Sequence, residues 1–159
     1  MNRKTKIIGV IGSSAPSASG LVLAYEVGRL LAEADVALVT GGLGGVMEAA
    51  SRGCSEADGL VLGILPGADS ESANPYVGIA VPSGMGHARN VLVVQTAQAL
   101  IAVEGALGTL SEIAIGLKTG RAVFLLGSTL QVEGAIHVVT PQQAVSEALA
   151  VLGKGSDGR

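Results

Sequence analysis

The chain has 159 residues, of which 48% are hydrophobic and 14% charged, and its net charge is −3. It is therefore long enough to bury the core of one domain. The acidic balance and an aromatic content of 2% argue against nucleic acid as a partner, because such surfaces need clustered Lys and Arg with stacking rings. One cysteine and two histidines argue against a disulfide framework and a metal site.

The N-terminal residues do not resemble a targeting segment. Basic residues at positions 3–6 precede the apolar run 7–12, which is too short and too rich in glycine for a signal peptide. No apolar stretch reaches the roughly 18–20 residues of a membrane span. These features favour a cytoplasmic protein with no membrane partner.

Apolar runs suited to buried strands alternate with segments of helical spacing along the chain. Strands are predicted at 6–12, 36–40, 60–64, 77–81, 99–103 and 122–126, with a short edge strand at 136–139. Helices are predicted at about 17–34, 43–57, 84–96, 108–119 and 141–152, the first with Ser17 or Ser19 as N-cap. The segment 65–76 contains two prolines and is predicted to be a loop.

This alternation predicts a single Rossmann-like α/β domain over residues 1–152, with a parallel sheet and helices on both faces. The polar residues 153–159 are predicted to form a flexible tail. Ligands of such folds bind at the carboxyl ends of the strands. Glycine-bearing turns follow the first, second and fifth predicted strands, so one shared cleft is expected there.

The turn after the second strand is the richest in glycine. It contains Gly41, Gly42, Gly44 and Gly45 and leads through Val46 to Met47. Glycine allows positive φ and a close approach of the backbone to a ligand, so this turn suits a phosphate cradle. It is not a dinucleotide fingerprint, whose last glycine would fall at position 47. A tight turn without a ligand is the alternative, although one glycine would be enough for it.

The turn after the first strand offers further donors. Gly12, Ser13 and Ser14 present N–H and hydroxyl groups that suit the same ligand. An ordinary turn with serine caps would also account for them.

The turn after the fifth strand leads into a helix N-terminus. Gly105 and Gly108 leave backbone N–H groups free there, and the helix dipole favours an anion. Thr109 and Glu112 have the spacing of a capping box, with Thr109 as N-cap, which would explain both without a ligand. In the functional alternative, Glu112 faces the cleft as a general base or a ribose-binding carboxylate.

Arg89 and Asn90 begin the helix after the long loop. Arg89 suits a phosphate clamp or a partner that holds Glu112 in position; an exposed helix cation is the alternative. His87 is a weaker candidate for catalysis. Cys54 lies within a predicted helix and is most simply a small packing residue.

Together, residues 41–47, Arg89-Asn90 and Gly108-Thr109-x-x-Glu112 resemble the Lonely Guy (LOG) and lysine-decarboxylase-like superfamily. The resemblance spans residues 6–126 and is closest to the short branch that includes molybdenum-cofactor carrier proteins. Carriers hold molybdenum cofactor, a pterin with a terminal phosphate. The cytokinin-activating members are phosphoribohydrolases of nucleoside 5′-monophosphates, and their catalytic Arg and Glu correspond here to Arg89 and Glu112.

The sequence departs from the hydrolase motifs at several positions. Asn90 replaces a Lys, Glu104 stands where the family has Pro, and Ala106 replaces a Gly. A carboxylate at position 104 would repel a phosphate unless it points away. Ala106 would cost energy if its position needs positive φ.

We therefore predict a binding protein for a phosphorylated small molecule, either a nucleotide or molybdenum cofactor, in a cleft built by residues 41–45 and 105–109. The alternative is a nucleoside 5′-monophosphate phosphoribohydrolase that uses Glu112 and Arg89. A distant likeness to DNA-processing proteins offers a third reading, which the acidic charge disfavours. The resemblance and the high apolar fraction also imply a homodimer.

Overall fold

The computed structural model describes residues 4–154 of the chain. The elements follow in the order β1 (Ile7–Gly12), α1 (Ala18–Glu33), β2 (Ala37–Thr40), α2 (Val46–Glu56), β3 (Val61–Leu65), β4 (Ile79–Pro82), the 3₁₀ helix η1 (Gly86–Ala88), α3 (Arg89–Thr96), β5 (Ala99–Val103), α4 (Leu107–Lys118), β6 (Ala122–Leu126), β7 (Ile136–Val138) and α5 (Pro141–Lys154). None of the helices in this described range is long and apolar enough to cross a membrane.

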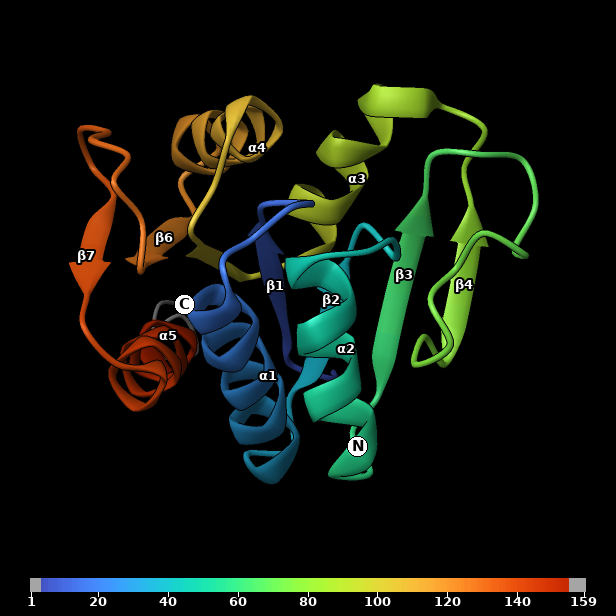
Figure 1. The fold of residues 1–159 in the computed structure, drawn as a ribbon. Coiled ribbons are helices and arrows are strands. Elements are labelled where there is room, and N and C mark those ends of the chain that lie inside the picture. Colours follow the sequence, from blue (N-terminus) through green and yellow to red (C-terminus); the bar gives the residue numbers. More distant parts are fainter. Residues whose placement is uncertain (1–3, 155–159) are drawn as a thin grey trace.

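The seven strands form one sheet in the order β4-β3-β2-β1-β5-β6-β7, and every neighbouring pair is parallel. The order reverses at β1, which pairs with β2 on one side and β5 on the other. In Figure 1 the arrow of β4 points up and that of β7 points down, because a twist of about 20–25° per strand accumulates across the sheet. The predicted Rossmann-like parallel sheet is confirmed.

Helices cover both faces of this sheet, as predicted. Helices α1, α2 and α5 lie side by side over one face (Figure 1) and share a core with strand residues such as Ile8, Leu38 and Ile101. Helices α3 and α4 pack on the other face against residues such as Val39 and Leu100. Successive strand residues point to opposite faces, so the two cores alternate along each strand, and β5 is buried over its whole length.

Two glycines allow α1 and α2 to touch backbone to backbone. A Cβ on Gly28 of α1 would lie 2.0 Å from the carbonyl oxygen of Ala50, and a Cβ on Gly53 of α2 would lie 2.0 Å from that of Tyr25. No side chain fits at either position without moving one helix. The contact therefore sets the spacing of α1 and α2, whose N-termini follow β1 and β2.

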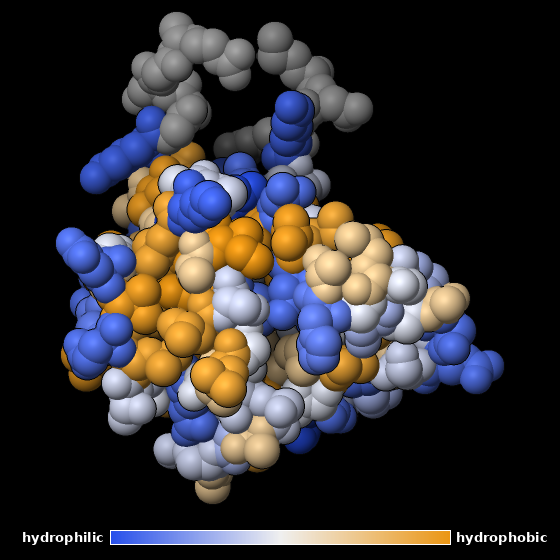
Figure 2. Space-filling view, turned by 90° about the horizontal axis from the view of Figure 1, so that it is seen from above, coloured by the Kyte–Doolittle hydropathy of each residue, from blue (hydrophilic) through white to orange (hydrophobic). Residues whose placement is uncertain are grey.

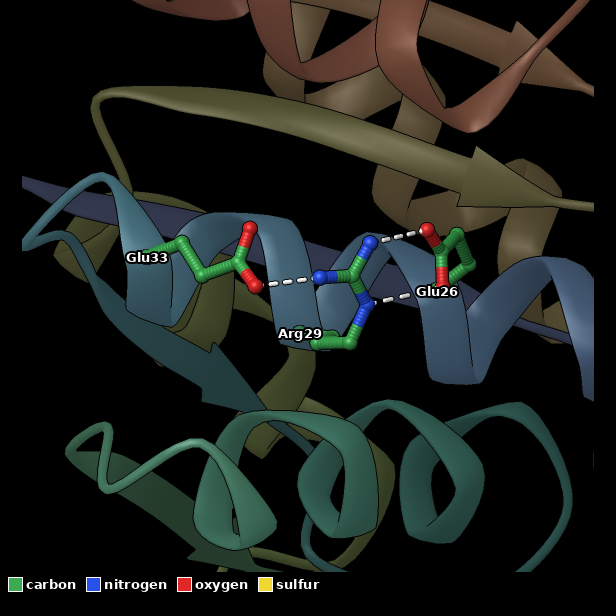
Figure 3. Close-up of polar contacts among 3 residues, drawn as sticks. All are labelled: Glu26, Arg29 and Glu33. Carbon is green, nitrogen blue, oxygen red and sulfur yellow. Dashed lines mark hydrogen bonds and ion pairs between the residues drawn. The ribbon is translucent and has the colours of Figure 1, made fainter.

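The outer surface of α1 carries a short charge network. Figure 3 shows Arg29 lying between Glu26 and Glu33, and all three belong to α1. The guanidinium forms ion pairs with both carboxylates, one three residues before it and one four residues after it. Its hydrogen bond to Glu26 lowers the pKa of that carboxyl. Solvent screens such exposed pairs, so they add little to stability.

Several predicted boundaries shift where glycines adopt positive φ. Helix α2 begins at Val46 rather than 43, because Gly42 and Gly45 have φ of 76° and 68°. The helix predicted over 84–96 is divided into η1 and α3, and Gly84 and Gly86 also have positive φ. Strand β4 occupies 79–82 rather than 77–81.

The predicted N-cap of α1 is confirmed, whereas the predicted end of α5 is too early. Ser17 is the N-cap of α1, and its side chain accepts a hydrogen bond from the N–H of Gly20. Helix α5 continues to Lys154, two residues beyond its predicted end. Residues 155–159 of the predicted tail lie outside the described residues.

Candidate functional site

A cleft of about 230 Å³ lies where the loops after β1, β2 and β5 meet the start of α3. Figure 2 looks down on the end of the molecule to which β3 and β4 point in Figure 1, and shows hydrophobic side chains gathered in a broad area beside hydrophilic ones. Residues lining the cleft are Val10, Ile11, Gly12, Ser13, Ser14, Gly41, Leu43, Met47, His87, Arg89, Asn90, Ala106, Gly108, Thr109 and Glu112.

Most of the predicted ligand-binding residues are thus brought together by the fold, although they come from four separate segments. The predicted residues that do not line the cleft are Gly42, Gly44, Gly45 and Gly105. Their places explain why. Gly42 packs against β3 and Gly45 against the carbonyls of Ser13 and Ser14, whereas a Cβ on Gly44 would meet only open space.

Gly41 makes room for the cation of the cleft. A Cβ at this position would lie 2.7 Å from Nη2 of Arg89 and 2.7 Å from the sulfur of Met47. The guanidinium therefore lies directly against the glycine turn, in space that a side chain at position 41 would share. Its Nε donates a hydrogen bond of 3.0 Å to the carbonyl of Ile64, which fixes the group at the end of β3.

Asn74 holds the glycine turn from behind, and sequence reasoning did not single it out. Its backbone N–H donates to the carbonyl of Gly42 at 2.9 Å, and Nδ2 donates to the carbonyl of Leu43 at 3.0 Å. In a trans peptide, the C=O and the following N–H point in opposite directions. The N–H groups of Leu43 and Gly44 therefore point away from Asn74, which does not line the cleft.

Two sets of backbone N–H groups are left without an intramolecular acceptor. Within residues 4–154, none accepts a hydrogen bond from the N–H groups of residues 43–45 or of the first α4 turn, residues 107–109. The first bond at the start of α4 is from Leu110 to the carbonyl of Ala106. Such groups at a glycine turn and a helix N-terminus are the ordinary donors of an anion site.

The predicted capping box at α4 is wrong in its register. The N-cap is Ala106, and Thr109 occupies N3, where its hydroxyl accepts a hydrogen bond from the N–H of Ala106 at 3.4 Å. Glu112 therefore lies beyond the first turn and does not cap the helix. Ala106 has φ of −136°, so its side chain costs no strain; the left-handed residue here is Glu104, with φ of 54°.

Glu112 and Arg89 are two buried ionisable groups of the cleft. Their exposed fractions are 9% and 8%. Burial raises the pKa of the Glu112 carboxyl to about 7, and the nearby Arg89 charge opposes this shift. Burial also lowers the pKa of Arg89, but a guanidinium stays protonated in proteins. No hydrogen bond to the Glu112 carboxylate comes from residues 4–154, so its oxygens are available to a ligand.

Asn90 and His87 complete this side of the cleft. Asn90 is buried, and its Oδ1 accepts a hydrogen bond from Nη1 of Arg89. Its Nδ2 lies 3.5 Å from the hydroxyl of Ser111. Asn90 thus orients Arg89 without adding a second positive charge. His87 lines the cleft from η1 but is exposed.

A larger groove of about 500 Å³ lies on the outer surface of α1 and α2 and shares only Gly45 with the predicted site. Its one cation, Arg52, pairs with Glu56 at 2.8 Å and lies 5.7 Å from the ring centre of Tyr25. Arg52 is therefore already engaged with protein groups. The buried polar residues Arg89, Asn90, Thr109 and Glu112 line the smaller cleft instead.

The fold and the cleft define a Rossmann-like α/β protein with its candidate site at the switch point of a parallel sheet. The sequence matches the model of the SLOG cluster4 family over residues 5–152, and the chain belongs to this family. The resemblance to the LOG-like superfamily and its short carrier branch is confirmed.

Similar proteins cover nearly the whole chain. An uncharacterised protein of Archaeoglobus fulgidus is 43% identical over 143 residues, which are 90% of this chain and 94% of that protein. The molybdenum cofactor binding protein of Rippkaea orientalis is 32% identical with a TM-score of 0.90, covering 95% of this chain and 99% of the other. The molybdenum cofactor carrier protein of Chlamydomonas reinhardtii is 30% identical with a TM-score of 0.86, covering 94% and 99%.

Proposed function

We propose that this protein binds a small molecule through its terminal phosphate, and that the ligand is a phosphorylated pterin of the molybdenum-cofactor type or a nucleotide. The observation that carries the proposal is the set of unpaired backbone N–H groups of Leu43, Gly108 and Thr109, which line the same cleft as the buried guanidinium of Arg89. Two of the similar solved proteins are described as binding or carrying molybdenum cofactor, which supports the pterin.

The dimensions of the cleft suggest how such a ligand would lie. Its volume of about 230 Å³ is below the roughly 300–1,000 Å³ of pockets that enclose a small molecule. The phosphate would occupy the cleft on the N–H groups of Leu43, Gly108 and Thr109, with Arg89 as counter-charge. The ring would remain at the mouth, where Ser13, Ser14 and His87 lie.

Replacing Gly108 by alanine should separate binding from folding. A Cβ at Gly108 would meet no atom within 4 Å, and alanine is the better helix former by about 1 kcal/mol. We therefore expect an unchanged or higher melting temperature, because the fold tolerates the methyl group. The methyl would occupy space that a phosphate on the α4 N-terminus needs, so binding should weaken about tenfold or more.

The measurement is thermal shift with AMP and with a pterin phosphate at millimolar concentration, since a ligand of the native state raises the melting temperature. Wild type should be stabilised, and Gly108→Ala should be stabilised less at the same ligand concentration. If neither compound stabilises wild type, the proposed function is wrong.

A second candidate is the nucleoside 5′-monophosphate phosphoribohydrolase. It is favoured by the Glu112 carboxyl, whose pKa of about 7 suits proton transfer near neutral pH. The test is incubation with AMP and N6-modified AMP, followed by chromatography of free base and ribose 5-phosphate. Base release that disappears in Glu112→Gln would establish the enzyme. We rank this candidate second because the neutral Asn90 stands where the hydrolases have a Lys.

We also propose that the protein is a cytoplasmic homodimer. Leu21 and Val22 on α1 are 42% and 69% exposed and line the groove of about 500 Å³, a surface that a second copy of the chain would cover. The sequence has a single cysteine and so forms no internal disulfide, which is typical of a protein from a reducing compartment.

Light scattering at micromolar concentration tests this association. Wild type should have the mass of two chains, and Val22→Lys should shift it towards one, because the exposed side chain leaves the monomer fold intact while charging the interface. A wild-type mass of 15.7 kDa would contradict the dimer.

A further inference from the structure

The helix that follows the first strand of a dinucleotide-binding fold receives the pyrophosphate on its N-terminus. The corresponding helix here is α1. It begins beside the point where β1 meets β5, which is the switch point of the sheet. Its N-terminus is therefore the position where a second phosphate of the ligand would be expected.

A carboxylate of the protein itself occupies this position. Glu104, the first residue after β5, accepts a hydrogen bond from the N–H of Ser17 through Oε2 at 3.0 Å. Its Oε1 accepts a second bond from the hydroxyl of Ser17. A Cβ on Gly20, in the first turn of α1, would lie 2.5 Å from the carboxylate carbon of Glu104. The carboxylate thus lies directly against the end of α1.

The backbone conformation at Glu104 also fixes the position of its side chain. Its φ of 54° is left-handed, which a residue with a side chain adopts at a cost of about 1 kcal/mol. Its own N–H is bonded to the carbonyl of Leu126 at 2.9 Å. A carboxylate at this position would repel a phosphate in the cleft unless it points away, and in the structure it binds the start of α1.

Glu104 forms no ion pair with another residue of the described range 4–154. Its negative charge is offset only by Ser17 and the N-terminal end of the α1 dipole. Ala106, two residues further on, and Ser14, three residues before Ser17, both line the cleft. A second phosphate extending from the cleft towards α1 would therefore be repelled by the Glu104 carboxylate. It would also find the N–H and hydroxyl of Ser17 already bonded to that carboxylate.

We propose that Glu104 is a specificity-determining residue that restricts the ligand to a single terminal phosphate and excludes diphosphates and dinucleotides. This inference rests on the proposed function, because it concerns the same cleft. The carboxylate takes the place of the second phosphate, so the ligand class is that of phosphomonoesters.

The experiment is calorimetric titration of wild type, Glu104→Gln and Ser17→Ala with AMP and with ADP. Wild type should bind AMP about tenfold more tightly than ADP, because like charges in juxtaposition disfavour the diphosphate. Glu104→Gln should lose most of this preference, since the amide has the same size without the charge. Ser17→Ala is the matched control: it removes a partner of Glu104 but keeps the carboxylate, so the preference should persist.

Melting temperatures of the variants identify any that fail to fold, and Glu104→Ala then replaces the glutamine variant. Equal affinities of wild type for AMP and ADP, or the same preference in Glu104→Gln as in wild type, would overturn the role of Glu104 and leave the proposed function intact. If wild type binds neither nucleotide, the inference about AMP against ADP is wrong, and the proposed function fails as well if no pterin phosphate stabilises wild type.

Discussion

Replacing Gly28 by alanine is expected to destabilise the protein by about 3 kcal/mol, the order of a severe overpacking defect. The added Cβ would lie 2.0 Å from the carbonyl oxygen of Ala50 and 3.0 Å from the N–H nitrogen of Cys54. Both are backbone atoms, so the clash is relieved only if α1 and α2 move apart. Alanine is otherwise the better helix former by about 1 kcal/mol, so the expected sign is opposite to that of helix propensity.

Gly53→Ala should have the same effect, because its Cβ would lie 2.0 Å from the carbonyl oxygen of Tyr25. Urea unfolding of both variants and of the double variant measures the effect. The double variant should lose less than the sum, since the first substitution already separates the helices. Gly108→Ala is the control within a helix, because its Cβ meets open space. Stability equal to wild type in Gly28→Ala would show that the two helices are not packed this closely.

Glu112→Gln is expected to be more stable than wild type at pH 8 by up to about 3 kcal/mol, and nearly equal to it at pH 4. Burial raises the pKa of the Glu112 carboxyl to about 7 from an ordinary value of 4.5. Between these two values, the unfolded chain releases the proton that the folded protein keeps. The stability of wild type therefore falls as the pH rises through this window, and the loss is complete above pH 7.

The glutamine side chain does not ionise, so the free energy of unfolding of Glu112→Gln does not fall through this pH window. At pH 4 the wild-type carboxyl is neutral and resembles the amide, which makes that pH the internal reference. The measurement is the free energy of unfolding in urea for both proteins at several values from pH 4 to pH 8. A difference between them that does not change with pH would show that Glu112 titrates at the same pH in both states, and that it is not buried in the way the cleft implies.

The sequence alone was sufficient for the strand–helix alternation and for the grouping of the site. Buried parallel strands are continuous apolar runs and the helices have a 3.6-residue period, so β5 and β6 coincide with their predicted bounds. The turns after β1, β2 and β5 were expected at one edge because parallel strands end together. For that reason Gly12, Gly41 and Thr109, which are distant in the sequence, all line the same cleft.

The tertiary structure alone decided where the polar side chains point and which glycines are essential to packing. Glu104 binds α1 rather than facing the cleft, and Asn74 holds the glycine turn from a different loop. Gly28 packs directly against the backbone of α2, a contact that no local sequence pattern indicates. The raised pKa of Glu112 likewise follows from its burial. The physical reason is common to all: periodicity reports the local conformation of the chain, whereas direction, burial and close approach depend on segments far away in the sequence.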